Sequence, residues 1–169
     1  MNQWGVRTWG EPCRECGFSW ALSTDEGLAV MTEVPARFRD AVGLSDGTTV
    51  GAGLGWPVTA YVCHVADNLR IFAERLVGVV RGGESRIAAY DQDELARCRG
   101  YERVAVEGAL WSLERAVDDW LTAIQLARAA DVVFEHPERG PYGWSDVVSS
   151  NLHDALHHEF DIRRILDSA

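Results

Sequence analysis

Two histidines, His153 and His157, lie four residues apart in the C-terminal part of the chain. Residues at this spacing lie on nearly the same face of a helix, one turn apart. A third imidazole, from His64 in an earlier predicted helix, can join them as a ligand of one metal ion. Three protein ligands leave a coordination position for water or substrate, as catalytic zinc sites do. The sequence therefore predicts a metal centre formed by His64, His153 and His157.

The same histidines also have a simpler interpretation. Each can lie at the boundary of the core, with its ring nitrogens satisfied by neighbouring carboxylates and no metal bound. His158 points about 100° away from His157 on a helix, so we expect it to face solvent. Asp161, one turn after His157, is expected either to orient that imidazole or to lie exposed beside Arg164.

A second motif with possible chemistry is Cys13-x-x-Cys16-Gly17, near the N-terminus. It has the form of a zinc knuckle, but structural zinc needs four ligands and the sequence holds no second Cys-x-x-Cys. Three interpretations stay open, namely a plain reduced pair, half of a metal site, or a redox couple. A half-site would be completed by His136, by a second copy of the chain, or by the main metal centre if the segment folds over it.

The elements that must position these residues are helices. Apolar side chains recur at steps of three and four residues in four stretches, which is typical of amphipathic helices in a bundle. We see no strand-like alternation of useful length. The predicted fold is therefore all-α, a four-helix bundle in one domain, 1–169. Its helices are expected at about 24–43, 57–80, 91–129 and 145–168, after an irregular, aromatic and cysteine-containing segment, 1–22.

Local signals refine these helices. Ser23 and Glu26 have the spacing of a capping box, and Asp91 is suited to cap the third helix. Pro35 is expected to kink or divide the first helix, because proline removes a backbone donor and clashes with the preceding turn. Gly100 is expected to bend the early half of the third helix.

Composition limits the classes of partner. The chain has 169 residues, 47% of them apolar, and a net charge of −10, which argues against a nucleic-acid backbone or an anionic membrane as partner. No run approaches the roughly 18–20 apolar residues of a membrane span, and the N-terminus lacks the pattern of a secretory signal. We therefore expect a cytoplasmic protein that acts on a small-molecule substrate and binds neither nucleic acid nor membrane.

The substrate pocket is expected to be shaped by the loops at 43–56 and 134–145, and neither has a recognisable code. Within the second loop, Arg139 is expected either to lie on the surface as an ordinary arginine or to meet an anionic group on a substrate.

Over about residues 24–168 the chain resembles the DinB-like superfamily. The resemblance rests on the single histidine within WPVTAYVCHVAD, residues 56–67, and on the His153/His157 pair, which fall in the expected helices and order. It implies a four-helix bundle, often dimeric, that binds a divalent metal through three such histidines. Carried onto this chain, the ligands are His64, His153 and His157, with zinc as the first expectation and nickel as the second.

The resemblance also implies an activity. Characterised relatives use low-molecular-weight thiols, as in mycothiol-dependent maleylpyruvate isomerase and in bacillithiol or mycothiol S-transferases. The arginine-rich sequence without lysine fits an actinobacterial source, for which mycothiol is the relevant thiol. The expected function is thiol-linked transfer or isomerisation at the metal centre, in a monomer or a homodimer. A non-catalytic metal-binding bundle, serving as a binding or stress-response module, and a hydrolase using metal-activated water remain the alternatives.

Overall fold

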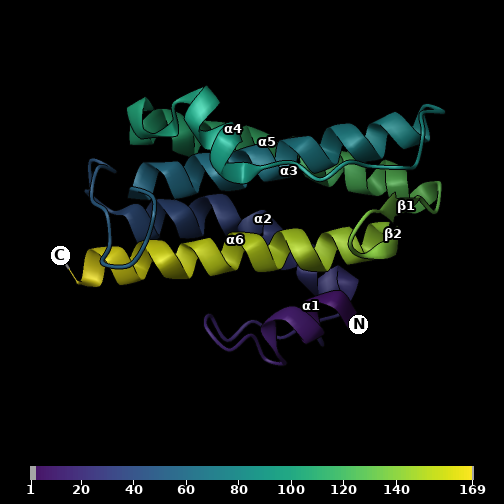
Figure 1. Ribbon diagram of the computed structural model, residues 1–169, viewed down its shortest axis with the longest axis horizontal. Helices are drawn as coiled ribbons and strands as arrows, with labels where there is room; N and C mark the ends of the chain where they lie inside the picture. Colours follow the sequence, from purple (N-terminus) through teal and green to yellow (C-terminus); the bar gives the residue numbers. More distant parts are fainter. Residues whose placement is uncertain (1–2, 169) are drawn as a thin grey trace.

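The structure is a computed structural model that describes residues 3–168; residues 1, 2 and 169 of the predicted domain lie outside the described part. Four long helices form a bundle, as predicted (Figure 1). They are α2 (Thr24–Val42), α3 (Val58–Val80), α5 (Val106–Ala129) and α6 (Trp144–Asp167). The smaller elements are α1 (Gln3–Trp9), α4 (Gln92–Arg99), the 3-10 helix η1 (Tyr101–Arg103), β1 (Val133–His136) and β2 (Gly140–Gly143).

The order of helices around the bundle is not their order in the sequence. Helices α2 and α6 run in one direction, and α3 and α5 run in the other (Figure 1). Helix α3 packs mainly along α5, and α2 mainly along α6, while contacts of α3 with α6 and of α2 with α5 close the ring. The consecutive helices α2 and α3 therefore occupy opposite corners, and the connection at 43–57 crosses one end of the bundle.

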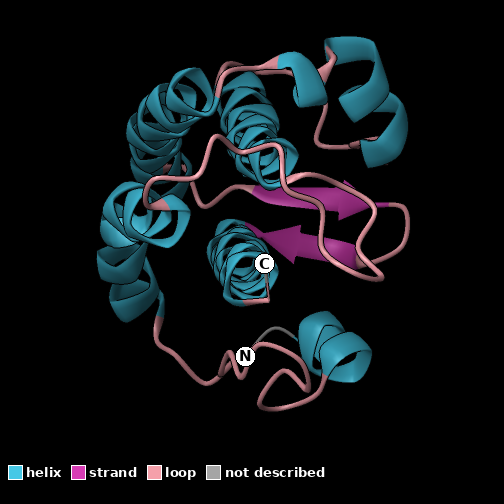
Figure 2. Cartoon of the chain, turned by 90° about the vertical axis from the view of Figure 1, so that its left-hand side faces the viewer, coloured by secondary structure: helices cyan, strands magenta, loops and turns pink. Residues whose placement is uncertain are grey.

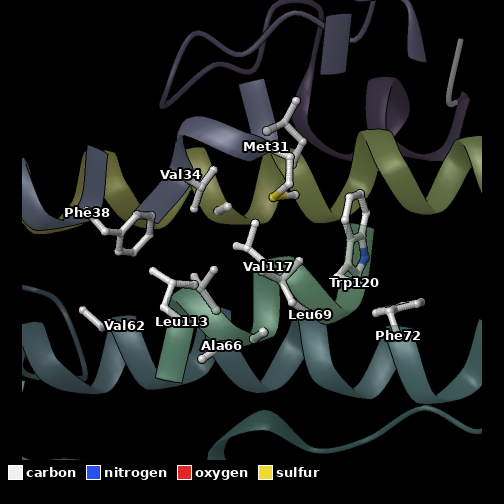
Figure 3. Packing of buried hydrophobic residues seen from close by; sticks show 14 of the residues in the cluster. Met31, Val34, Phe38, Val62, Ala66, Leu69, Phe72, Leu113, Val117 and Trp120 are labelled. Carbon is white, nitrogen blue, oxygen red and sulfur yellow. The ribbon is translucent and has the colours of Figure 1, made fainter. Parts of the chain in front are cut away.

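The core lies where the four apolar stripes meet. Figure 3 shows Met31 and Phe38 of α2 directed toward the side chains of α3 and α5, among them Leu113. All three side chains are fully buried, and burial of a side chain of this size stabilises the fold by about 1.5–3 kcal/mol. Trp120 of α5 is also enclosed, and its Nε1 donates a hydrogen bond to Oδ1 of Asn151 on α6 at 2.8 Å.

The predicted caps are confirmed. Oγ of Ser23 accepts a hydrogen bond from the Glu26 N–H at 3.3 Å, and Oε2 of Glu26 accepts one from the Ser23 N–H at 2.9 Å. Oδ1 of Asp91 accepts hydrogen bonds from the first turn of α4. Pro35 lies inside α2, which runs without a break from Thr24 to Val42, so the proline does not divide this helix.

The single helix predicted at 91–129 is wrong, because the structure has α4, η1 and α5 in this stretch. Gly100 ends α4 in the left-handed conformation, with φ of 63°, which glycine adopts without steric cost. A buried carboxylate stabilises the interruption: Asp67 of α3 accepts a hydrogen bond from Oη of Tyr101 at 2.6 Å and pairs with Nε of Arg99 at 2.9 Å. The chain therefore turns at this point instead of continuing as a helix.

Two further expectations are wrong. Strands β1 and β2 pair as an antiparallel hairpin where no strand was expected; each has only four residues, too few for alternation to be recognised. The segment predicted to be irregular contains α1. Helix α1 approaches Trp20 closely at Gly5, where an added Cβ would lie 2.3 Å from Cζ3 of the indole. Figures 1 and 2 both place α1 and the coil after it beside α6, outside the ring of four helices.

Across residues 3–168, none of the helices combines the length and the apolar character needed to cross a membrane.

Candidate metal centre

A cavity of about 340 Å³ lies between α3, α6, the hairpin and the N-terminal segment, and all five histidines of the chain line it. Three tryptophans of the N-terminal segment, Trp4, Trp9 and Trp20, form part of its wall. Two arginines, Arg75 of α3 and Arg139 of the hairpin turn, also line it. The cavity therefore combines an aromatic wall, two guanidinium groups and several side chains of the types that bind metals.

Among residues 3–168, side chains of metal-binding types form two groups, and within each group the possible ligand atoms all lie within 4.8 Å of one another. The three histidines predicted as one centre do not share a group: His64 is in the first, whereas His153 and His157 are in the second. The three-histidine set therefore stays a prediction for the metal-bound protein. The first group is His64, Asp154 and His158, and the second is Cys13, Cys16, His153 and His157.

Helical geometry explains the separation. Successive residues of α6 are rotated by about 100° around the helix axis. His153 and His157 therefore face one side of α6, toward the N-terminal segment, where their rings contact that of Trp9. Asp154 and His158, one residue further along, face α3, which carries His64.

In the first group, Oδ1 of Asp154 lies close to both imidazoles. It is 3.4 Å from Nε2 of His64 and 3.7 Å from Nε2 of His158. The centroids of the two rings are 4.9 Å apart, and the rings are nearly perpendicular. Two imidazole nitrogens and one carboxylate oxygen thus point toward one another at the cavity wall. This donor set suits zinc, which accepts such ligands at about 2.0–2.2 Å, and it also suits nickel.

Further hydrogen bonds orient two members of this group. Nδ2 of Asn68 donates to Oδ2 of Asp154 at 2.7 Å, and the hydroxyl of Tyr90 donates to Oδ1 of Asn68 at 3.3 Å. Nδ1 of His158 lies 3.1 Å from Oδ2 of Asp161, which leaves Nε2 for the group. Outer contacts of this kind fix the tautomer and the direction of metal ligands.

The expectation that His158 faces solvent is wrong. Its side chain is only 17% exposed, and its ring lies 5.2 Å from that of Tyr61, centroid to centroid. The physical reason is that α3 packs on this face of α6. Asp161 lies near both predicted neighbours, but it is closer to His158, at 3.1 Å, than to His157, at 3.9 Å.

Electrostatics in the first group favour an ionised carboxylate. Burial by itself raises the pKa of Asp154, but His64, His158 and the hydrogen bond from Asn68 together hold the pKa below its ordinary value. Burial by itself lowers the pKa of His158, yet Asp161 and Asp154 outweigh it, so the pKa lies above its ordinary value. The group is therefore organised around a negative charge at Asp154.

The second group joins the N-terminal segment to α6. Sγ of Cys13 lies 4.0 Å from Nδ1 of His157, and Cys13 is 2% exposed. Burial raises the pKa of the Cys16 thiol to about 11 and lowers the pKa of His153 to about 4. Near neutral pH, without metal, Cys16 is therefore a thiol and His153 a neutral imidazole.

Sequence reasoning missed Asp154 and His158 as possible ligands. The available signal was their spacing, since they are four residues apart on α6, as His153 and His157 are. Asn68 carried a weaker signal, because it lies one turn after His64 on α3. Tyr90 lies in a connection without regular structure, and no sequence pattern pointed to it.

No protein-family model matches the sequence, and no curated protein matches it. Among solved structures, the chain is similar to YfiT from Bacillus subtilis, a probable metal-dependent hydrolase with an unusual four-helix bundle topology. The TM-score is 0.70 at 22% sequence identity, and the match covers 85% of this chain and 84% of that chain. This chain has the four-helix-bundle fold of that protein. The comparison thus confirms the fold that the resemblance implied, and at this identity it extends to the fold alone.

Proposed function

We propose that this protein is a metal-dependent enzyme whose centre is formed by His64, Asp154 and His158. The observation that carries the proposal is the meeting of these three ligand-type side chains at the wall of a cavity of about 340 Å³. Structural zinc sites are filled by four protein ligands, whereas catalytic sites keep one position open. A group of three donors beside a cavity fits the catalytic kind, and the three-histidine set is its alternative.

Each side chain has a distinct role in this proposal. A divalent metal, zinc in the first place and nickel in the second, would act here as a Lewis acid and lower the pKa of a thiol or water in the open position. Asp154 contributes negative charge, and Asn68 holds its second oxygen at 2.7 Å. Oδ2 of Asp161 accepts a hydrogen bond from Nδ1–H of His158 and so keeps the lone pair of Nε2 directed into the group.

Two arginines of the cavity wall favour an anionic group on the substrate. The Arg139 guanidinium lies 3.9 Å from the centroid of the Trp4 ring, and its Nη1 donates to Oη of Tyr142 at 2.7 Å. Within the described residues, the buried Nε of Arg139 has no hydrogen-bond partner, which is costly for a buried donor. A carboxylate or phosphate in the cavity would pair with the Arg139 guanidinium, and Arg75 adds a second positive charge to the same cavity. We therefore infer an anionic small molecule as substrate.

Thiol-linked transfer or isomerisation is the first candidate reaction, with a low-molecular-weight thiol of the mycothiol type as co-substrate. Its support is the sequence resemblance to thiol-dependent members of the DinB-like superfamily. In a transfer, the thiol loses its proton, its sulfur forms a bond to the electrophilic carbon, and the leaving group departs with the electron pair of the broken bond. Hydrolysis is the second candidate, because the similar structure YfiT is a probable metal-dependent hydrolase.

The test is a rate measurement with and without a thiol. The zinc-loaded protein is incubated with mycothiol and an electrophile that carries a carboxylate, and the same electrophile is supplied without thiol. We expect thiol-dependent turnover that disappears in Asp154→Ala and in His158→Ala. Asp118→Asn, which changes a half-exposed carboxylate on α5, should keep the wild-type rate.

Other outcomes separate the alternatives. Turnover that needs metal but no thiol would support hydrolysis. Loss of metal-dependent turnover in His153→Ala, with full turnover in Asp154→Ala, would support the three-histidine set instead. If the electrophile reacts at the same rate with and without metal, in the presence and in the absence of thiol, the protein is not a metal-dependent enzyme for this chemistry. That result would favour the non-catalytic metal-binding module.

A further inference from the structure

We propose that Cys13, Cys16, His153 and His157 form a second, structural zinc site that fastens the N-terminal segment to α6. This site goes beyond the proposed function and does not rest on it, because the two groups of side chains have no ligand in common. Its role is to hold one wall of the cavity in place, since the segment also supplies Trp4, Trp9 and Trp20 to that wall.

The donor set is the first argument. Two thiolates and two imidazoles are a complete tetrahedral set for structural zinc, and the spacings Cys-x-x-Cys and His-x-x-x-His both match those of such sites. With bonds of about 2.0–2.3 Å, neighbouring ligand atoms of a zinc tetrahedron are about 3.3–3.8 Å apart. All four ligand atoms already lie within 4.8 Å of one another. Small side-chain movements would therefore complete the tetrahedron.

An unsatisfied polar atom is the second argument, and it is independent of the first. His153 is 5% exposed, and its Nε2 is enclosed without a hydrogen-bond partner among residues 3–168. A buried ring nitrogen without a partner destabilises the folded state. Coordination of a metal by His153 would remove the need for a hydrogen bond at the coordinating nitrogen. The side chain is thus placed as a ligand would be.

Aromatic side chains of the N-terminal segment surround the two histidines. The ring of His153 lies 4.6 Å from that of Trp20 and 5.3 Å from that of Phe18, centroid to centroid. Trp9 contacts both histidines, with ring centroids 5.3 Å from His153 and 5.4 Å from His157. Aromatic rings of the N-terminal segment therefore pack against both imidazoles and hold them in place, as expected for ligands of a metal that stabilises structure.

Two carboxylates lie near the ring nitrogen of His157 that faces away from Cys13. Because Nδ1 of His157 faces Cys13, its Nε2 is the outer nitrogen. That Nε2 lies 3.6 Å from Oε2 of Glu15 and 3.9 Å from Oδ2 of Asp161. Metal-ligating histidines usually donate their second N–H to a carboxylate, which fixes the tautomer. Glu15 lies between the two cysteines in the sequence, so the cysteine turn itself supplies one of these carboxylates.

The backbone turn brings both sulfurs to the same side. The Gly17 N–H donates to the Cys13 carbonyl at 3.0 Å, and the Cys13 N–H donates to the Phe18 carbonyl at 2.8 Å. Gly17 has φ of 75°, a conformation that glycine adopts readily. Both sulfurs lie within 4.8 Å of the ligand nitrogens of His153 and His157, and a redox couple gives these two imidazoles no role. Metal binding therefore explains the pair better than redox chemistry does.

Metal stoichiometry tests the site. The full-length protein is saturated with zinc, freed of excess, and measured for bound zinc per chain. We expect two equivalents in the wild type and one in each of Cys13→Ser, His157→Ala and His64→Ala. Two matched controls should keep two equivalents of zinc. They are His136→Gln, which changes a cavity histidine outside both groups, and Cys98→Ser, which changes an exposed cysteine.

Cobalt(II) identifies the ligands of each equivalent. Cobalt-loaded wild type and cobalt-loaded His64→Ala should show the sulfur-to-cobalt charge-transfer band of thiolate coordination, and Cys13→Ser should lack it. If the wild type binds only one equivalent of zinc, and both His64→Ala and His157→Ala lose it, the histidines share one centre and the proposal is overturned. A Cys13–Cys16 disulfide in the purified protein, or a cobalt spectrum without the sulfur band, would also overturn it.

Alkylation of the wild type needs no substitution and covers the case in which a variant fails to fold. In the zinc-loaded protein, iodoacetamide should modify Cys98 and spare Cys13 and Cys16. After treatment with a chelator, both cysteines of the pair should react. Equal reactivity of the pair before and after chelation would contradict the site, whatever the outcome of the activity test.

Discussion

The Asp154 carboxylate is held in one orientation by a short chain of hydrogen bonds. Asn68 donates to its Oδ2 at 2.7 Å, and Tyr90 donates to Asn68 at 3.3 Å. Oδ1 is left directed toward His64 and His158. Because a carboxylate fixed in this way loses little rotational freedom when it binds a metal, Asn68 is a positioning residue for the proposed centre.

Replacement of Asn68 should weaken this centre selectively. In Asn68→Ala, we expect zinc affinity at the first group to fall by about 10–100-fold, the usual cost of losing an outer contact of a metal ligand. The measurement is a competition for zinc with a chelator of known affinity. The equivalent bound by Cys13 and Cys16 serves as an internal control and should not change. Wild-type affinity for both equivalents would argue against the role of Asn68.

The sequence predicted which helices carry ligands but not which side chains of α6 meet His64. Both His153 with His157 and Asp154 with His158 have the spacing of one helical turn. The choice between them depends on the rotation of α6 about its own axis relative to α3. A hydrophobic stripe defines that rotation only to within about one residue, which is the 100° that separates the two pairs.

At the scale of elements, the position of α1 depends on a glycine, Gly5. Gly5 allows α1 to lie against the indole of Trp20, which is 2% exposed. Trp20 in turn contacts His153. The position of α1 is thus connected through one buried ring to the second group of ligands.

An added methyl group at Gly5 should displace α1. In Gly5→Ala, the Cβ would lie 2.3 Å from the Trp20 ring, so we expect faster tryptic cleavage after Arg7 in the native protein. Gly108→Ala on α5 is the control, because nothing lies within 4 Å of the added Cβ and alanine favours helix by up to about 1 kcal/mol. The prediction fails if the two variants are cleaved at the same rate.

The interruption after α4 depends on Asp67. The buried carboxylate accepts from Tyr101 and pairs with Arg99 and Arg70. In Asp67→Ala the Tyr101 hydroxyl loses its partner, and we expect the free energy of unfolding to fall by about 1–3 kcal/mol. Urea unfolding measures the change. Asp118→Ala, on the surface of α5, should stay within about 0.5 kcal/mol of the wild type.

Short elements were the least predictable. Four-residue strands carry too little alternation to recognise, and the apolar stripe of α5 gives no sign of where the helix begins. The break at Gly100 could be predicted only as a bend, since the Asp67 contact that stabilises it joins residues far apart in the sequence. By contrast, the cap residues Ser23 and Asp91 act on their own turns and could be predicted directly.

At the scale of the whole molecule, the bundle core and the second group of ligands are largely separate. Met31, Leu69 and Leu113 pack where α2, α3 and α5 meet, whereas the second group lies between α6 and the segment outside the ring. The apolar stripes predicted the bundle, because each long helix had to bury one face. They did not predict that α2 and α3 occupy opposite corners, since a stripe does not identify the helix that covers it.

Metal removal should therefore loosen the N-terminal segment without unfolding the bundle. After chelation, we expect hydrogen exchange to accelerate in residues 3–22, while the amides of α3 and α5 keep their protection. The His157→Ala variant should show the same pattern without a chelator. Loss of protection throughout the four long helices would contradict the separation of core and ligand groups, and unchanged exchange in residues 3–22 would contradict the fastening role.

Helix α6 supplies adjacent residues to two different neighbours, with His153 and His157 toward the cysteine turn and Asp154 and His158 toward α3. Deletion of a single amino acid between Trp144 and Leu152 would turn the rest of this helix by one position and bring each pair of ligands to the wrong neighbour. Divergent descendants of this gene should therefore keep the number of residues within the first two turns of the last helix constant.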